Sequence, residues 1–324
     1  MNNNYRIYGR FITRSPLSHI SESESTCSFL VQDPILQPDG EIEEVFAYNG
    51  NAWRGQLRDL SATYLLERLN IQIDLEAFHL LFSGGKIGGD QSIDIQKAKM
   101  MRKVVPHVSI FGGGIGTQIM QGKLKVGSSY PLCSEAMPVV HSKYHNQASK
   151  ISYCDLTTEK SFTRFDDSKN FDLHDKVKVD EQHLLETKQK KKEGDVSTQM
   201  RMTSELLIAG VTLAHEIDLI NIDEIELGVI VSALTLFAQA PYIGGQSNKG
   251  HGRVDYFAEI VNTKTGEVKD LIRINDDLPK LSQIAQQAKD AYDDHLVKIY
   301  NAFLEKKESE IRGLLGASEC GSLL

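Results

Sequence analysis

The stretch from residue 223 to residue 262 constrains the fold most, because its periodicity changes twice around a cluster of glycines. An apolar helical pattern, DEIELGVIVSALTLFAQA, begins at Asp223, which is a candidate N-cap followed by an acidic first turn. An alternating strand pattern, RVDYFAEIV, ends the stretch. Between them, four glycines stand in the nine residues 244–252. Glycine is costly to order, so this cluster indicates a special backbone shape or a close approach to a ligand. Its amides, with Lys249 and Arg253, suit an anion, and a flexible turn is the alternative.

The rest of the chain completes a recognisable order of elements. Residues 5–13 alternate as a strand, with Tyr5, Ile7 and Phe11 on one face. Residues 51–69 show helical spacing of Trp53, Leu57, Leu60 and Tyr64, which should face the core, with Asn49 or Asn51 as cap. We expect further strands in KLKVG and QMRMTSELLIAGVTL, a possible strand in HVSIF and a helix in LEAFHLLF. Residues 15–50 read as a long loop with a hairpin near Pro38, Asp39 and Gly40, and residues 278–315 as an amphipathic helical tail that ends in a mobile GASECGSLL. Once insertions are removed, the order is strand, helix, strand, strand, helix, strand, so we predict an α+β fold with a ferredoxin-like, RRM-like core.

Two positions offer basic groups for phosphate. Arg54 and Arg58 are four residues apart and share a helical face near the helix start, where free amides add positive potential. Lys86 lies in a second glycine-rich loop, SGGKIGGD. The alternative for the two arginines is an exposed pair that bonds to Asp59 or Glu67.

The composition is that of an ordinary globular protein, and it limits the possible cellular location and partners. The chain has 324 residues, of which 40% are apolar and 25% charged, and it contains no apolar run long enough to span a membrane and no signal-peptide segment at its N-terminus. Four scattered cysteines without a CxxC pair favour a reduced, cytoplasmic protein. The net charge of −8 argues weakly against nucleic acid, but charges cluster locally: acids dominate 22–44 and 216–226, and bases gather at 6–14, 54–58, 97–103 and 188–192.

Residues 139–200 differ from the rest because they are polar, charged and irregular. A segment of this length inside a compact domain is usually functional or disordered, and we interpret it as an inserted arm. Its run of lysines at 190–192 is either a nucleic-acid contact or a solvated charge cluster. A zinc site would use Cys133, His141, His145 and Cys154, but their spacing is not that of a common finger. Likewise GGGIG at 112–116 is not followed by a good helix, which argues against a dinucleotide site, so no metal or cofactor is expected.

Four segments in a particular order carry a family resemblance. They are TRSPLSHIS after the first strand, NGNAWRGQLRDL at the first helix, SIFGGGIGTQIMQGKLKV in the middle and IGGQSNKGHGRV before the last strand. This order, over about residues 5–262, resembles the RAMP superfamily, and within it the Cas-seven-type backbone subunits of class 1 CRISPR effector complexes. NAWRG departs from the more usual small-residue and lysine version, and with the overall length this looks most like the type IV backbone subunit.

The resemblance implies a binding protein that polymerises along CRISPR guide RNA (crRNA) and presents the spacer for pairing with a target nucleic acid. It implies a single elaborated domain over 1–324, with a ferredoxin-like palm, a finger insertion at about 70–110, a thumb at about 139–200 and a C-terminal helical tail at 278–324. The implied partners are guide crRNA, further copies of the chain in a helical filament, a large subunit, a five-prime-handle cap subunit and a crRNA-processing endonuclease, with no membrane. Whether the target is DNA or RNA stays open. The RNA-binding residues expected from the resemblance and the local chemistry are Arg14, His19, Asn51, Trp53, Arg54, Arg58, Lys86, Gly244, Gly245, Gln246, Asn248, Lys249, Gly250 and Arg253.

The alternative from another class is a metal-dependent ribonuclease. Related type III subunits are similar in carrying a catalytic aspartate in the loop after the first strand, and here that loop contains Asp33 in FLVQDPIL. A single carboxylate is not a nuclease signature, because metal-assisted phosphoryl transfer usually gathers several ligands. An aspartate before proline is also common in turns. We therefore expect Asp33 not to be catalytic.

Overall fold

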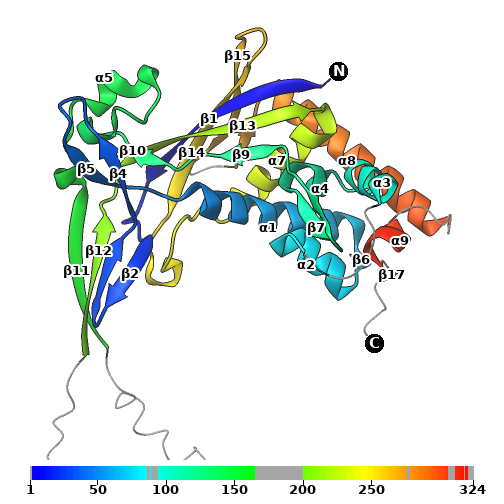
Figure 1. Ribbon diagram of the computed structural model, residues 1–324, viewed down its shortest axis with the longest axis horizontal. Helices are drawn as coiled ribbons and strands as arrows, with labels where there is room; N and C mark the ends of the chain where they lie inside the picture. The colour runs from blue at the N-terminus through cyan, green and yellow to red at the C-terminus, as the bar shows by residue number, and fades with distance from the viewer. Residues whose placement is uncertain are drawn as a thin grey trace, which may run out of the picture.

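The computed structural model describes residues 2–85, 88, 94–164, 200–275, 278–305, 311–316 and 318–319. Their architecture is α+β, with a large antiparallel sheet and a long helix near the C-terminus, as predicted (Figure 1). The sheet has the order β10-β13-β1-β14-β15-β16, and β9 also pairs with β13. Its strands are β1 (Asn3–Thr13), β9 (Leu124–Val126), β10 (Tyr130–Pro131), β13 (Thr212–Ile222), β14 (Val254–Asn262), β15 (Val268–Ile274) and β16 (Lys280–Leu281).

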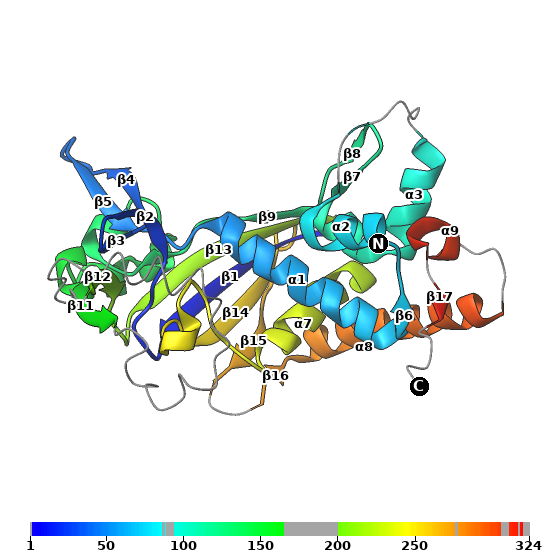
Figure 2. The same cartoon turned by 90° about the horizontal axis from the view of Figure 1, so that it is seen from below.

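Strand β1 lies in the middle of this sheet and alternates as its sequence predicts. Ile7 and Phe11 are buried on one face, while Arg6, Tyr8 and Arg10 are only half-buried on the other. Helices α1 (Gly50–Leu69) and α7 (Glu224–Phe237) cover the buried face, and α8 (Gln283–Leu304) lies against α7 (Figure 2). The core therefore lies between the sheet and these helices.

Helix α1 begins and packs as the sequence predicts. The side chain of Asn49 accepts a hydrogen bond from the backbone N–H of Asn51, which confirms Asn49 as the cap. Trp53, Leu57 and Tyr64 are buried at helical spacing, and Leu60 is packed against the same core.

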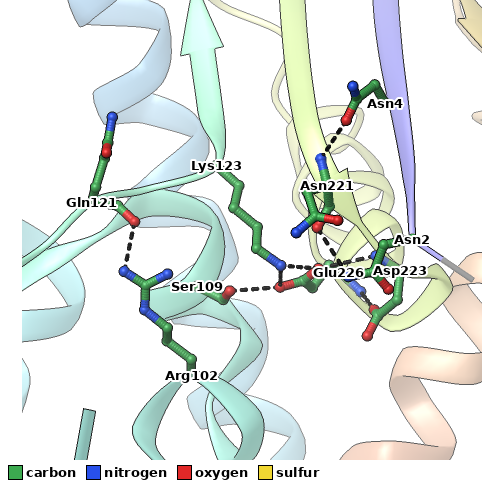
Figure 3. A network of polar contacts seen from close by, with 9 residues as sticks. All are labelled: Asn2, Asn4, Arg102, Ser109, Gln121, Lys123, Asn221, Asp223 and Glu226. Carbon is green, nitrogen blue, oxygen red and sulfur yellow. Dashed lines mark hydrogen bonds and ion pairs between the residues drawn. The ribbon is translucent and has the colours of Figure 1, made fainter. Parts of the chain in front are cut away.

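Helix α7 begins with a capping box that is tied to the neighbouring segments. Asp223 accepts from the N–H of Glu226, and the Glu226 carboxylate accepts from the N–H of Asp223. The same carboxylate accepts hydrogen bonds from Lys123 Nζ over 2.6 and 2.7 Å and from Ser109 Oγ over 2.6 Å (Figure 3). This partly buried ion pair joins α7 to the chain that leads into β9.

A second sheet projects from one end of the molecule, with the order β11-β12-β3-β2 (Figure 1). Beside it lies the β4–β5 hairpin, whose turn at Pro38 to Gly40 is as predicted, with Gly40 at φ +94°. The prediction of one long loop over 15–50 is wrong, because this region forms four strands. Most residues of these strands are polar or exposed, so their sequence carries little of the apolar alternation that indicates a strand. The strands of this region are β2 (Ile20–Glu24), β3 (Cys27–Leu30), β4 (Gln32–Leu36), β5 (Ile42–Phe46), β11 (Thr157–Arg164) and β12 (Met200–Leu207).

The arm predicted over 139–200 is also ordered in its first part. Val140, Tyr144, Ala148 and Leu156 are buried in the main core, and β11 then pairs with β12. The short helical turns here are η1 (Ser134–Ala136), η2 (Ser142–Tyr144), α5 (His145–Ala148) and η3 (Tyr153–Leu156). The prediction of an irregular arm is therefore wrong for 139–164, and residues 165–199 lie outside the described residues.

Three other expectations are corrected. QMRMTSELLIAGVTL is not one strand: β12 ends at Leu207, the chain turns at Gly210 with φ +90°, and β13 begins at Thr212. HVSIF is helical, because Pro106 begins a short helix whose residues are all buried. Part of the tail predicted to be mobile forms β17 (Ser318–Glu319), which pairs with β6 (Ile71–Gln72).

The opposite end of the molecule is formed mostly by short helices and one hairpin (Figure 2). The expected finger region over 70–110 falls here. The elements are α2 (Leu75–Ser83), α3 (Ile95–Val104), α4 (Pro106–Phe111), β7 (Gly113–Ile115), β8 (Gln118–Met120) and α9 (Ile311–Leu315). Within the described ranges, no helix is both long and apolar enough to cross a membrane.

Candidate nucleic-acid interface

Three segments that are far apart in the sequence meet beyond the end of β1. The chain that leaves β1 runs beside the glycine-rich loop 241–253, and backbone hydrogen bonds join them. The N–H of Arg14 donates to Arg253 O over 2.7 Å, that of Gly252 to Pro16 O over 2.9 Å, and that of Gly245 to Ser18 O over 2.6 Å. The two predicted binding segments therefore form one continuous surface.

The start of α1 is the third segment. Gln56 Nε2 donates to the carbonyl of Tyr242 over 2.8 Å, which fixes α1 to the beginning of the glycine-rich loop. The N–H of Asn49 points to Nε2 of His19 at 3.4 Å, and the His19 ring lies edge-on to Tyr48 with centroids 5.0 Å apart. Burial lowers the pKa of His19, so its ring accepts here as a neutral imidazole.

Most glycines of the loop are required by the chain's own backbone, through close contacts or a positive φ. A Cβ at Gly244 would lie 2.3 Å from Ser18 O, and one at Gly252 would lie 2.1 Å from Ile243 O; both residues have positive φ, +73° and +83°. Gly250 also has a positive φ, +84°, although no atom lies within 4 Å of its Cβ position. Gly245 alone has no positive φ and meets only Ser18 O, at 3.8 Å. Internal geometry thus requires glycine at three of the positions, and Gly245 is the one at which an added side chain would be accommodated.

A cluster of basic groups borders the loop on the side of β11. Lys249 Nζ lies 4.2 Å from the centroid of the Phe162 ring, a cation–π contact. Burial lowers the pKa of His251, and the charges of Lys160 and Lys249 lower it further. Arg253, at the end of the loop, is exposed. The loop therefore combines a neutral histidine with a local excess of positive charge, in a chain whose net charge is −8.

Lys160 and Phe162 are site residues that the sequence reasoning missed. They belong to TTEKSFTR, which lies within the segment interpreted as irregular. The alternating pattern of this octapeptide was the available signal, but its apolar content is one residue, too little to identify a strand.

Several polar atoms of the loop and of the chain beside it have no hydrogen-bond partner within the described part of the chain. They are Ser18 Oγ, Gln246 Oε1 and His251 Nδ1, all shielded from solvent. Gln246 also has a positive φ of 58°, uncommon for a residue with a side chain. The local fold thus leaves some hydrogen-bonding groups at this loop without a partner among the described residues.

The remaining predicted residues are placed as follows. Asn51 and Asn248 are exposed, at the start of α1 and in the loop. Arg14 is exposed, with Nε 3.6 Å from Asp255 Oδ2. Lys86 lies outside the described residues.

Trp53 is not at the surface, so its prediction as an RNA contact is wrong. Its side chain is 0% exposed and lies among Phe11, Phe237 and Tyr256. The spacing that places Leu57 in the core also directs Trp53 there.

Arg54 and Arg58 share a face as predicted, but that face binds carbonyl oxygens of the chain. Both guanidinium groups donate to the carbonyl of Phe111, and Arg58 donates also to Gly112 O, each of its bonds being 2.7 Å. Arg58 is only 7% exposed; burial and the neighbouring charge of Arg54 lower its pKa to about 10. The pair thus neutralises the C-terminal carbonyls of α4, and Arg58 is corrected from an RNA contact to a structural residue.

The amides at the start of α1 are largely used within the chain. The N–H of Asn51 donates to the Asn49 side chain, and those of Ala52 and Trp53 point to Asn49 O over 3.0 and 3.2 Å. The expectation of free amides at this helix start is therefore wrong for these three residues.

Asp33 lies on β4, not in a loop, and accepts a 2.8 Å hydrogen bond from the Tyr130 hydroxyl. Among the described residues, no group of three or more His, Cys, Asp or Glu side chains is placed to share a metal ion. The four residues weighed for zinc have other surroundings: burial raises the pKa of Cys133 to about 12, and His145 Nε2 lies 3.1 Å from Val140 O.

No family model matches the chain, and no curated protein matches it. By structure, the chain is similar to a chain of a solved assembly described as a Type IV-B CRISPR Complex, with a TM-score of 0.56 and 20% sequence identity. The match covers 80% of this chain and 91% of that chain. The protein therefore shares its fold with a chain of a type IV-B CRISPR complex.

Proposed function

We propose that this protein is a guide-RNA-binding backbone subunit of a type IV class 1 CRISPR effector complex, which polymerises along crRNA and presents the spacer to a target nucleic acid. The observation that carries the proposal is the meeting of three segments: the exit of β1, the start of α1 and the glycine-rich loop. These are three of the four segments on which the sequence resemblance rests. The shared fold with a chain of a type IV-B CRISPR complex supports it independently.

The connectivity of the central sheet supports a ferredoxin-like palm. The chain runs from β1 through α1 to β9 and β10, then through β13 and α7 to β14. In space, β1 lies between β13 and β14, and β9 and β10 lie on the outer edge of β13. This is the strand order of the split βαββαβ motif that RNA-recognition modules use.

The proposed interface binds the sugar–phosphate backbone by charge. Lys160 and Lys249 supply cations beside the loop. Arg253 and Arg14, which are joined through the backbone, lie together at its end. Such contacts tolerate any spacer sequence and leave base edges free to pair, and each phosphate contact makes binding more salt-dependent. Phe162 adds a ring on which a base can stack. We retain His19, Asn51, Arg54, Gly244, Gly245, Gln246, Asn248 and Gly250 as neighbours of this surface.

The wider assembly follows from the same proposal. The segment 139–200, to which β11 belongs, is proposed as a thumb, the region 70–110 as a finger and 278–324 as a helical tail. The partners proposed are further copies of the chain, a large subunit, a five-prime-handle cap subunit and a crRNA-processing endonuclease. We propose binding without turnover, because nothing around Asp33 in the described structure favours the ribonuclease alternative.

The test is to purify the protein under nuclease-free conditions from cells that express a CRISPR array, and to extract any bound nucleic acid. The expected result is co-purified RNA of defined length that carries spacer sequence, with an elevated ratio of absorbance at nucleic-acid to protein wavelengths. Nucleic-acid-free protein that cleaves a complementary RNA and loses this activity in Asp33→Asn would overturn the proposal and restore the ribonuclease.

A further inference from the structure

The β4–β5 hairpin presents an acidic surface with an apolar tip. Leu36 and Ile42 are paired across its end, and each is 65% exposed. Glu44 follows on the same face by strand alternation, while Ile35 and Val45, on the other face, are buried. We call Leu36, Glu41, Ile42 and Glu44 the hairpin patch; all four are exposed.

No positive charge balances these acids locally in the sequence. From residue 15 to residue 53 the chain contains seven acidic residues and no lysine or arginine. An exposed apolar pair beside acidic groups is suited to contact a partner that offers apolar and basic side chains.

The opposite end of the molecule presents the complementary chemistry. On α3, Ile95 is 60% exposed and Met100 is 44% exposed. Lys99 and Lys103 follow Ile95 at four-residue spacing, so these three share one face of the helix. We call Ile95, Lys99, Met100 and Lys103 the helix patch.

The helix patch is held in a defined position. The buried residues Met101 and Val104 anchor the other face of α3, and Arg102 donates a 2.9 Å hydrogen bond to Gln121 O, just beyond β8. Figures 1 and 2 both place the β4–β5 hairpin and α3 at opposite ends of the long axis, so one chain cannot bring its own two patches together.

We propose that the hairpin patch of one copy docks on the helix patch of the next copy, so that the two patches form the repeating contact between neighbouring subunits. This rests on the proposed function, which it deepens by naming the surfaces that join the copies. Two different but complementary patches on each chain make a head-to-tail contact, and such a contact propagates into an open filament unless it closes a ring. The acidic and basic groups set direction, because hairpin against hairpin and helix against helix both oppose like charges.

The occupant is a second copy because each patch finds on this same chain a partner of opposite charge, with apolar side chains to cover its own. A different protein on either patch would leave the other patch without a partner in every copy. If a different subunit docks on one of the patches, self-assembly of this protein will not depend on both patches, and the experiment below detects that outcome.

The experiment reverses the charge of each patch in the full-length protein. One variant carries Glu41→Lys and Glu44→Lys, and the other carries Lys99→Glu and Lys103→Glu. The size distribution is measured by sedimentation velocity, with the protein alone at rising concentration and on a single-stranded RNA long enough for several copies. Wild-type protein is expected to form assemblies of several copies, and each variant alone is expected to associate at least tenfold more weakly.

Mixing the two variants is the decisive step. In the mixture, each reversed hairpin meets a reversed helix, and each native hairpin meets a native helix. Assembly is therefore expected to return with both variants present in equal amounts. Matched controls place the same changes of charge on exposed residues elsewhere and are expected to assemble as wild type: Lys264→Glu with Lys298→Glu, and Glu267→Lys with Asp294→Lys.

Variants that assemble as well as wild type, a mixture that stays unassembled although both proteins are folded by circular dichroism, or controls that lose as much as the variants would overturn the interface. Failure of the proposed function is a different observation, namely wild-type protein that binds no RNA. The concentration-dependent self-association of the protein alone, and its recovery on mixing, would still report on the two patches in that case.

Discussion

The backbone N–H of Gly245 donates a 2.6 Å hydrogen bond to the carbonyl of Ser18. This bond ties the glycine-rich loop to the chain that leaves the central strand, and Gln56 of α1 bonds to the loop's first part. The surface is thus formed by the fold itself before any ligand arrives. A preformed surface loses less conformational entropy on binding than a flexible turn would.

The glycines of this loop should separate into two classes. Gly244→Ala places a Cβ against Ser18 O in a left-handed backbone, so it should lower the free energy of unfolding by about 1–3 kcal/mol. Gly245→Ala should change it by no more than about 0.5 kcal/mol. Chemical denaturation of both variants checks this, and equal stability of Gly244→Ala and wild type would contradict the geometry described.

At Gly245 the effect should appear in binding. Because this position accommodates a side chain, Gly245→Val should stay folded but hold an RNA backbone away from the loop. A titration with guide RNA should therefore show weaker binding at an unchanged melting temperature. Normal RNA affinity in a folded Gly245→Val protein would show that the loop does not lie against RNA.

Arg58 should act on stability more than on binding. Its guanidinium is buried and satisfies the carbonyls of Phe111 and Gly112, so Arg58→Ala should lower the free energy of unfolding by about 2–3 kcal/mol. Arg58→Lys should recover only part, because an ammonium group lacks the planar fork. A stable Arg58→Ala protein with weaker RNA binding and a smaller salt slope would restore the phosphate role given to it from the sequence.

Local signals were enough to predict the framework. The caps Asn49 and Asp223 lie next to the helices that they begin, and the alternation of β1 lies within one strand, so each could be read from a few neighbouring residues. The three binding segments were identified by their order, but only the fold could show that they touch. Residues 139–164 were misread because Val140, Tyr144 and Leu156 follow no regular period, although tertiary packing buries all three.

The site was predicted less well than the fold. The same helical period that identified α1 already placed Trp53 in the core, and the resemblance nevertheless put it at the RNA. The partners of Arg58 could not be read from the sequence, because the Phe111 and Gly112 carbonyls reach it only through the packing of α4 on α1. Lys160 enters the interface through the pairing of β11 with β12, which is also non-local.

Buried histidines should make the protein sensitive to acid. Burial lowers the pKa of His215 to about 3, whereas an unfolded histidine titrates near 6.5. The unfolded state therefore binds the proton first, and stability that is complete above about pH 6.5 is lost as the pH falls toward 3, by about 1.4 kcal/mol per pH unit for this group. His107, whose pKa burial also lowers to about 3, should behave alike.

Denaturation curves between neutral pH and pH 4.5 measure this slope. His215→Phe keeps an aromatic ring beside Phe11 and Tyr256, so it should reduce the slope by one proton and leave that of His107 in place. An unchanged slope in this variant would show that His215 is not the group that titrates on unfolding.

Asp33→Asn should leave RNA binding unchanged, and it should not alter RNA cleavage, because Asp33 is expected not to be catalytic. The amide can still accept the hydrogen bond from Tyr130 through its oxygen, so the hairpin should keep its structure. The assay incubates the assembled complex with complementary RNA and magnesium or manganese. Cleavage at regular intervals by wild type that disappears in Asp33→Asn would contradict this prediction.

The proposed function requires that the loop 244–253 and its basic neighbours bind an RNA backbone. Its most direct test is the salt dependence of guide-RNA affinity for the triple variant Lys160→Ala, Lys249→Ala and Arg253→Ala, beside a control triple of exposed bases elsewhere: Lys264→Ala, Lys269→Ala and Lys298→Ala. We expect the triple variant to bind every spacer sequence more weakly, with the slope of log affinity against log salt reduced by about two to three, and the control to behave as wild type. Unchanged affinity and slope in the folded triple variant, or an equal loss in the control, would contradict it.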